Sequence, residues 1–234
     1  MQLHEQTGGL FDPGILEALE QAGYNRGIEE LRLYGAPVGA PVIAVPHAAR
    51  FNSLRLDPLH KRIHLPDGLR IDLGGIAKGW IAGQAAQILS RWTGACAVDA
   101  GGDVFLHGLP RGEKIWRVAL EDPRDPSRTL AVLKLPPGAV ATSTTTRRRW
   151  QQGGQERHHL IDPRTHLPAQ SSWQSVTAIA PTATEAEVYA KALLIAGPKG
   201  LKRITRLEAG VEFIAVDQHG KLWGSKHTRE YLDA

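Results

Sequence analysis

The chain has 234 residues, of which 42% are hydrophobic and 22% are charged, and this composition predicts a soluble globular protein with a substantial core. No apolar run reaches the roughly 18 residues that a transmembrane helix needs, and the first residues lack the pattern of a signal peptide. Cys96 is the only cysteine, which excludes an internal disulfide. The sequence as it stands therefore predicts a soluble, cytoplasmic chain without a membrane span, and leaves the compartment itself open.

The charge of the chain limits the classes of ligand that we expect it to bind. The net charge of +4 and the isoelectric point near 9.3 favour anionic ligands, either nucleic acid or a pyrophosphate. The densest basic run is Arg147-Arg148-Arg149. A solvated loop or strand edge explains such a run more often than a nucleic-acid site does, since no recognition motif accompanies it. We therefore expect no nucleic-acid partner and keep nucleic-acid binding as the weakest functional alternative.

The hydrophobic pattern of the first half predicts two helices and several short strands. A helix is expected at 13–22, with Ile15, Leu16 and Leu19 facing inward. Short strands are expected at 54–56, 62–65 and 69–73, with a hairpin turn at Asp67-Gly68 before the last of them. The clearest helix covers 78–92 and places one set of apolar side chains on its inward face, namely Ile81, Ala85, Ile88, Leu89 and Trp92.

Strands dominate the second half. They are expected at 95–100, 104–106, 116–120, 130–135, 176–180, 211–216 and 221–224. A helix at 184–196 interrupts them and is stopped by Gly197-Pro198. Strand-rich stretches interrupted by a few helices predict an α+β fold rather than strict βαβ alternation. Because no repeat or linker divides the chain, we expect one domain over residues 1–234, with mixed or antiparallel strands and a few packed helices.

The segment 71–79, IDLGGIAKG, joins a predicted strand to the first long helix through the glycine pair Gly74-Gly75. Glycines let the backbone approach a ligand, and the first turn of a helix presents unpaired N–H groups and the positive end of its dipole, which together suit a phosphate. Asp72 and Lys78 add a carboxylate and an ammonium at this junction. A purely structural turn is the alternative interpretation.

Three further segments carry the residue types of a functional site, namely 97–103 (AVDAGGD), 141–146 (ATSTTT) and 158–165 (HHLIDPRT). The first is another strand that ends in a glycine pair beside carboxylates, so two such ends can face one pocket. The second is equally explained as an ordinary strand with threonines, and a lone histidine is more often structural than catalytic. The four segments together favour a site.

Taken in order, these segments resemble the FAD:protein FMN transferases, the ApbE-type flavin transferases. The resemblance covers most of the chain and includes three more segments, at 7–13 (TGGLFDP), 116–123 (WRVALEDP) and 180–187 (APTATEAE). The family pattern begins several dozen residues before Thr7. The resemblance therefore implies an ApbE-like domain over residues 1–234 that lacks the N-terminal part of the pattern, including part of the flavin-binding wall.

The resemblance implies an α+β fold that binds FAD and uses a divalent cation, usually magnesium, to transfer FMN to a Thr or Ser hydroxyl of an acceptor protein. AMP is the leaving group. A hydroxyl is a weak nucleophile, so the site needs a base for its proton and positive charge for the pyrophosphate. His159 matches the family histidine before the Asp-Pro turn and is the expected base, with Asp72 second. Family members often work at the bacterial cell envelope, although nothing in this sequence exports the chain.

The resemblance also assigns a set of cofactor-binding positions, which are Leu10, Phe11, Asp12, Asp72, Lys78 and Ile161. The first three match a backbone-rich stretch that cradles FAD. Gly75 matches a position whose backbone oxygen binds the metal ion. Two of these residues have alternative roles, since Phe11 can be a core residue and Asp12, which precedes Pro13, can cap the short helix.

Two departures from the family pattern fall in the late helix. The family usually has an Asp and, four residues on, a Thr, both commonly metal ligands, whereas this chain has Glu187 and Lys191. Glu187 can still bind magnesium through a carboxylate oxygen, although Thr184 and Glu187 also fit a capping box. Lys191 cannot bind a metal ion while it is protonated. We expect its ammonium to replace part of the metal's charge, with an exposed Glu187–Lys191 pair as the alternative.

Further departures bear on loop geometry and on activity. His166 and Thr144 both stand where the family prefers glycine, which leaves the local backbone less certain. Lys191 and the absent N-terminal part of the pattern also motivate the main alternative function, an FAD-binding protein without transferase activity.

Overall fold

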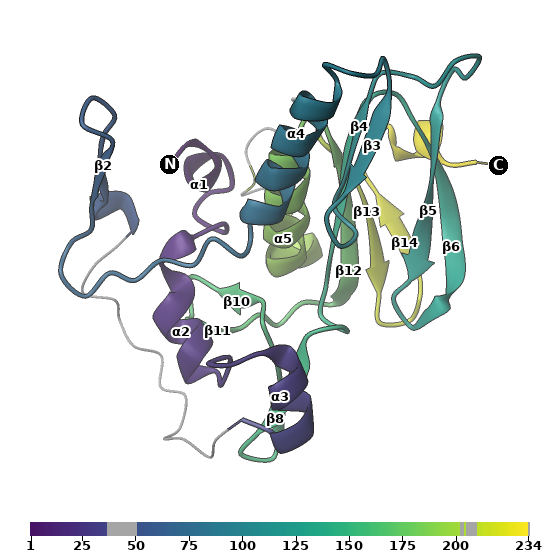
Figure 1. Cartoon of the computed structure of the whole chain (residues 1–234). Helices are drawn as coiled ribbons and strands as arrows, with labels where there is room; N and C mark the ends of the chain where they lie inside the picture. The colour runs from purple at the N-terminus through teal and green to yellow at the C-terminus, as the bar shows by residue number, and fades with distance from the viewer. Residues whose placement is uncertain (37–50, 202–203, 205–209, 234) are drawn as a thin grey trace.

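A computed structural model describes residues 1–36, 51–201, 204 and 210–233 of the chain (Figure 1). Its centre is a six-stranded sheet with the order β14-β13-β12-β7-β4-β3, and every pairing between these strands is antiparallel. The strands are β3 (Cys96–Asp99), β4 (Val104–His107), β7 (Gly138–Thr144), β12 (Trp173–Ala180), β13 (Glu212–Asp217) and β14 (Leu222–Gly224). The predicted α+β class is confirmed, with antiparallel strands in the main sheet.

Alternation along the central strands gives the sheet two apolar faces. Ala141 on β7 and Ala178 on β12 are directly paired and belong to the cluster on the helical side. Their neighbours Val140 and Ile179, also paired, belong to the cluster on the other side. Because successive side chains of a strand point to opposite faces, β7 and β12 are buried on both sides and need a covering layer on each.

Those covering layers are a pair of helices and a hairpin (Figure 1). Helices α4 (Ala77–Leu89) and α5 (Ala183–Gly200) cover one face, and the hairpin of β5 (Trp116–Asp122) and β6 (Asp125–Leu135) covers the other. Leu133 and Leu135 of β6 are fully buried in the cluster beneath the hairpin. The three layers place the amino ends of α4 and α5 beside each other.

The remaining elements are short. The N-terminal part contains α1 (Gln2–Gln6), the 3-10 turn η1 (Pro13–Ile15), α2 (Leu16–Gln21) and α3 (Ile28–Tyr34). Small hairpins pair β1 (Arg55–Asp57) with β2 (Arg62–His64), β8 (Arg149–Gln152) with β9 (Gln155–His158), and β10 (Ile161–Asp162) with β11 (Leu167–Pro168). Two further 3-10 turns cover Phe51–Ser53 and Thr228–Tyr231. Trp150 of β8 ties the N-terminal helices to this region, since its Nε1–H donates to the carbonyl oxygen of Ala22 at 2.8 Å.

Three details differ from the expectations. Residues 69–73 form no strand with any described segment; instead the Asp72 N–H donates to the carbonyl oxygen of Pro13 at 2.8 Å. The large apolar residues predicted to face inward from a helix at 78–92 face solvent, with exposed fractions of 55% for Ile81 and 87% for Trp92, and Trp92 lies beyond the end of α4 at Leu89. The buried face of this helix consists of small residues, namely Gly79, Ala82 and Ala86.

The late helix begins and ends differently from the predicted span. Thr182 caps α5, and Glu185 completes a capping box with it, so the suggested box between Thr184 and Glu187 is wrong. The predicted stop is confirmed as a break, because Gly197 has the non-helical φ of 59° and the helical backbone resumes only after it. No helix in the described ranges is long and apolar enough to cross a bilayer.

Candidate functional site

Two adjoining cavities lie where the N-terminal segment meets the amino ends of α4 and α5. The first, which we call the inner cavity, has a volume of about 180 Å³ and the second, the outer cavity, about 350 Å³. Gly74, Arg148, His159 and Lys191 line both, so the two spaces are continuous. Every residue that the sequence assigned to the site lines one or both. The inner cavity takes Leu10, Phe11, Asp12, Asp72, Gly75 and Ile161, and the outer takes Lys78 and Glu187.

The wall at residues 10–12 of the inner cavity is held by hydrogen bonds between backbone groups and side chains. The Phe11 N–H donates to Thr7 Oγ1 at 3.1 Å, and the Phe11 carbonyl oxygen contacts His4 Nδ1 at 2.8 Å. Asp12 caps η1, because its Oδ1 accepts the Gly14 N–H at 2.7 Å. The structural roles considered for Phe11 and Asp12 are therefore present, and both residues still line the cavity.

The glycine pair lies between this wall and α5. Asp72 Oδ1 accepts the Gly74 N–H at 3.0 Å, which closes the turn before α4. Gly75 is buried, and a Cβ at this position would overlap the Lys191 ammonium. The end of the Lys191 side chain thus lies directly against Gly75.

The outer cavity contains a cluster of one cation and two carboxylates. Lys78 forms an ion pair with Asp103, and its Nζ lies 3.6 Å from Glu187 Oε1. Glu187 Oε2 accepts the Gly79 N–H at 2.8 Å. Burial raises the pKa of both carboxyl groups, and the nearby Lys78 ammonium opposes this rise. Asp103 belongs to the second glycine-rich segment, and the two segments therefore do face one pocket.

The two neighbouring histidines have different environments. His158 is engaged at both ring nitrogens, since its Nδ1 accepts the Leu160 N–H at 3.3 Å and its Nε2 lies 3.1 Å from the Ala169 carbonyl oxygen. His159 lines both cavities, and its buried Nδ1 has no hydrogen-bond partner among the described residues. Burial, followed by the charges of Lys191 and Arg148, lowers the pKa of His159 well below its usual range.

Arg148 is the site residue that the sequence did not single out. Its neighbours in the basic run have partners elsewhere, because Arg147 pairs with Glu121 and Arg149 with Glu156, and only Arg148 of the three lines both cavities. The basic run was the available signal.

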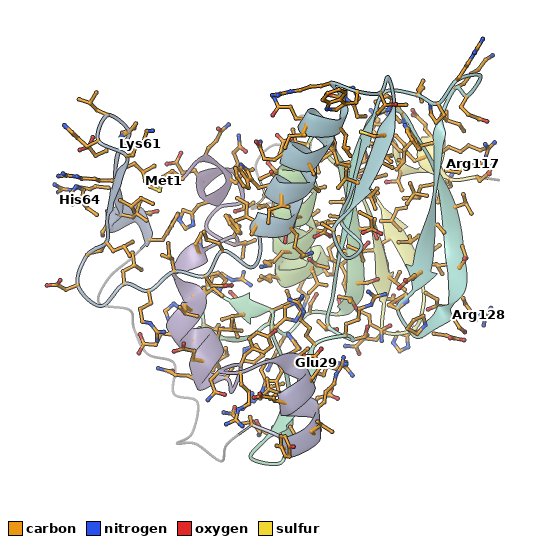
Figure 2. The ribbon with its side chains drawn as sticks, in the orientation of Figure 1. Met1, Glu29, Lys61, His64, Arg117 and Arg128 are labelled. Carbon is orange, nitrogen blue, oxygen red and sulfur yellow. The ribbon has the colours of Figure 1, made fainter. Side chains whose placement is uncertain are left out.

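Other positive side chains are spread apart, since Lys61 and Arg117 lie at opposite sides of the molecule (Figure 2). This spread does not favour the nucleic-acid alternative.

Lys191 is placed by α5 one turn after Glu187, yet the two do not form the exposed pair that was considered. Glu187 is only 5% exposed, and its ion-pair partner among the described residues is Lys78. The Lys191 side chain lies instead across Gly75. Burial lowers the pKa of Lys191, and the carboxylates of Asp72 and Glu187 oppose this effect.

The loop after the Asp-Pro turn tolerates its departure from the family pattern. His166 adopts a φ of 56°, the left-handed conformation that glycine adopts most readily. Asp162 holds the turn through its Oδ1, which accepts the Arg164 N–H at 2.9 Å, and through an ion pair with the Arg164 guanidinium at 2.6 Å. The replacement of glycine by histidine has therefore kept a backbone conformation of the glycine type.

Fold and site together define an α+β protein with a basic, carboxylate-bearing double cavity between an N-terminal segment and the helical face of an antiparallel sheet. The chain belongs to the ApbE family, which its sequence matches over residues 1–215. A relative from Escherichia coli (strain K12) named FAD:protein FMN transferase is 32% identical over 174 residues, which are 72% of this chain and 49% of the relative. A relative of the same name from Rhodobacter capsulatus is 28% identical over 98% of this chain and 43% of its own length.

Solved structures agree with this assignment. The crystal structure of the ApbE protein from Thermotoga maritima matches with a TM-score of 0.84 and 30% identity, over 100% of this chain and 75% of that chain. The apo structure of the Pseudomonas stutzeri flavinyl transferase ApbE matches in fold, with a TM-score of 0.78 and 23% identity, over 100% of this chain and 72% of that chain. The chain spans about half the length of the curated relatives it matches.

Proposed function

We propose that this chain transfers FMN from FAD to a Thr or Ser hydroxyl of an acceptor protein and releases AMP. The observation that carries the proposal is the position of His159, which lines both cavities together with the cations Arg148 and Lys191. An isoalloxazine ring suits the inner wall formed by residues such as Leu10, Phe11 and Ile161. A pyrophosphate suits the continuous region beside Arg148 and Lys191.

The transfer needs one bond to form and one to break. The acceptor hydroxyl oxygen attacks the phosphorus on the FMN side of the pyrophosphate, and the bond between this phosphorus and the bridging oxygen breaks. AMP leaves with the electron pair on that oxygen. Lys78, Arg148 and Lys191 supply positive charge to the phosphate oxygens and to the departing AMP.

His159 takes the hydroxyl proton in this proposal. Its lowered pKa keeps the imidazole neutral at pH 7, so that it can accept a proton, and the same positive neighbours that lower the pKa attract the phosphates. Asp72 is the second candidate base, because its carboxylate also lines the inner cavity. His158 is excluded from this role, since both of its ring nitrogens are engaged by the backbone.

The proposal gives magnesium, which the family resemblance implies, no required role in this chain. Its predicted ligands are the Gly75 carbonyl and the Glu187 carboxylate, and that assignment stays a prediction. Among the described residues, no three His, Cys, Asp or Glu side chains are grouped so that they could hold a metal ion. Glu187 already accepts the Gly79 N–H, and the Lys191 ammonium lies against Gly75. An ammonium against Gly75 opposes a second cation at that place, so the proposal assigns the charge to the protein's own cations.

The test is to incubate the purified chain with FAD and a Thr- or Ser-bearing acceptor protein, with and without magnesium, and to quantify AMP by chromatography. Transferase chemistry predicts that AMP accumulates in step with loss of FAD, and that a Thr- or Ser-bearing acceptor gains covalent flavin fluorescence. FAD binding without any AMP would instead support the alternative of a binding protein. A chain that binds no FAD would contradict both functions.

A further inference from the structure

Lys191 has an unusual position for a lysine side chain. It lies across the buried Gly75, and a Cβ at that glycine would approach Lys191 Cε to 2.8 Å and Cδ to 3.3 Å, besides overlapping the ammonium. The end of the side chain thus occupies the space beside the Gly75 Cα, and Lys191 also lines both cavities. In this position the Lys191 ammonium lies at the double cavity, against Gly75.

The ammonium is not committed to a protein partner. Across the described ranges it makes no hydrogen bond or ion pair, whereas Lys78 nearby is paired with Asp103. Lys191 lines both cavities, with Asp72 in the lining of the inner one and Glu187 in the lining of the outer one. A partly buried cation without a close counter-ion is costly unless a ligand supplies the negative charge. The site is therefore arranged to receive an anion at Lys191.

We propose that Lys191 is a built-in cation, whose ammonium stands in for a divalent metal ion beside Gly75 and binds the pyrophosphate of the dinucleotide directly. The identity of the dinucleotide rests on the proposed function, while the place of the charge rests on the Gly75–Lys191 contact. A magnesium ion at the same place would meet an ammonium and be repelled. Binding of the pyrophosphate is consequently independent of magnesium in this chain.

The experiment is a calorimetric titration of FAD, and separately of inorganic pyrophosphate, into the protein in EDTA and in magnesium. Wild type should bind FAD with the same affinity, within about threefold, in both buffers. Lys191→Met keeps the length of the side chain and removes the charge, and should weaken both ligands by about 10- to 100-fold, the range expected for a hydrogen bond to a charged group. Lys199→Met changes an exposed lysine of the same helix and should bind as wild type does.

A gain of function completes the design. Lys191→Thr replaces the ammonium by a hydroxyl oxygen that can bind a metal, so its FAD affinity should become dependent on magnesium, and bound Mn²⁺ should be detected by electron paramagnetic resonance. Circular dichroism of each variant verifies that the fold is retained. Removing a partly buried charge does not threaten the fold, because burial of an unpaired cation is itself destabilising.

Two results would overturn the inference. One is a wild type whose FAD affinity falls more than tenfold in EDTA, and the other is a Lys191→Met variant that binds both ligands as wild type does. The proposed function fails separately: pyrophosphate binding that depends on Lys191, together with no FAD binding, would retain the built-in cation and reject the flavin substrate. AMP release that is insensitive to Lys191→Met would retain the flavin substrate and reject the built-in cation.

Discussion

Close packing between α4 and α5 makes Gly79→Ala a sharp test of how the outer cavity is built. A Cβ at Gly79 would overlap the carbonyl oxygen of Ala183 and would lie 2.6 Å from its carbonyl carbon and 2.9 Å from the Thr184 nitrogen. These are backbone atoms in the first turn of α5, and they cannot rotate away as a side chain can. Alanine therefore forces the two helices apart by about 1 Å to reach normal contact distance.

The cost follows from three terms. Overpacking of this kind costs roughly 1–3 kcal/mol, and weakening of the bond from the Gly79 N–H to Glu187 adds about 1 kcal/mol. The better helix propensity of alanine returns about 1 kcal/mol. We expect a net destabilisation of about 2 kcal/mol, which corresponds to a decrease in Tm of roughly 4–8 °C for a chain of this size.

Gly83→Ala is the matched control, because Gly83 lies one turn later on α4 and a Cβ there would meet nothing within 4 Å. It should stabilise the protein by roughly 0.5–1 kcal/mol. Urea unfolding followed by far-ultraviolet circular dichroism measures both changes, and FAD titration measures whether separation of the helices also weakens the site. If the Gly79→Ala variant proves as stable as the Gly83→Ala variant, then α4 and α5 do not pack as closely at Gly79 as described.

Two further predictions concern the base and the acid stability. His159→Ala should reduce AMP release by roughly 100- to 10,000-fold with little change in FAD affinity, whereas His158→Ala should mainly lower stability; a larger loss of AMP release in the second variant would reject the assignment. Arg124 lowers the pKa of Asp122 from 3.8 to about 2, so this carboxylate contributes stability that is present above pH 3.8 and lost as the pH falls toward 2. Asp122→Asn should therefore flatten the pH dependence of unfolding in this interval, and an unchanged slope would refute the pairing.

The sequence predicted the fold class correctly, and the segments that it proposed for a site lie together in the structure, because both depend on local signals. Glycine pairs, the Asp-Pro turn and the clustered hydroxyl groups are short patterns, and the structure brings their predicted residues to two joined cavities. The break in α5 was predicted for the same reason, since Gly197-Pro198 interrupts a helix whatever surrounds it.

Short sequence patterns could not predict the contacts between segments that are distant in the chain. The predicted inward face of α4 was wrong. Periodicity favours large apolar residues on a buried face, whereas the approach of α5 at Gly79 leaves room only for small ones. The Lys78–Asp103 pair depends on how the turn between β3 and β4 meets α4, and no local signal encodes that meeting. Arg148 is distinguished from Arg147 and Arg149 only by which partner each side chain reaches.

The order of the strands in the sheet determines the stage of folding at which the cavity is completed. Central strands β7 and β12 pair across the intervening segment 145–172, which carries both Arg148 and His159, while Leu10 of the opposite wall is translated long before either. Closing such long loops is entropically costly and slow. During synthesis or refolding, the residues that line the cavity opposite Leu10 are brought to it only when the sheet has formed. Added dinucleotide should consequently slow unfolding and leave the early refolding rate unchanged, because only the last assembly step creates its binding site.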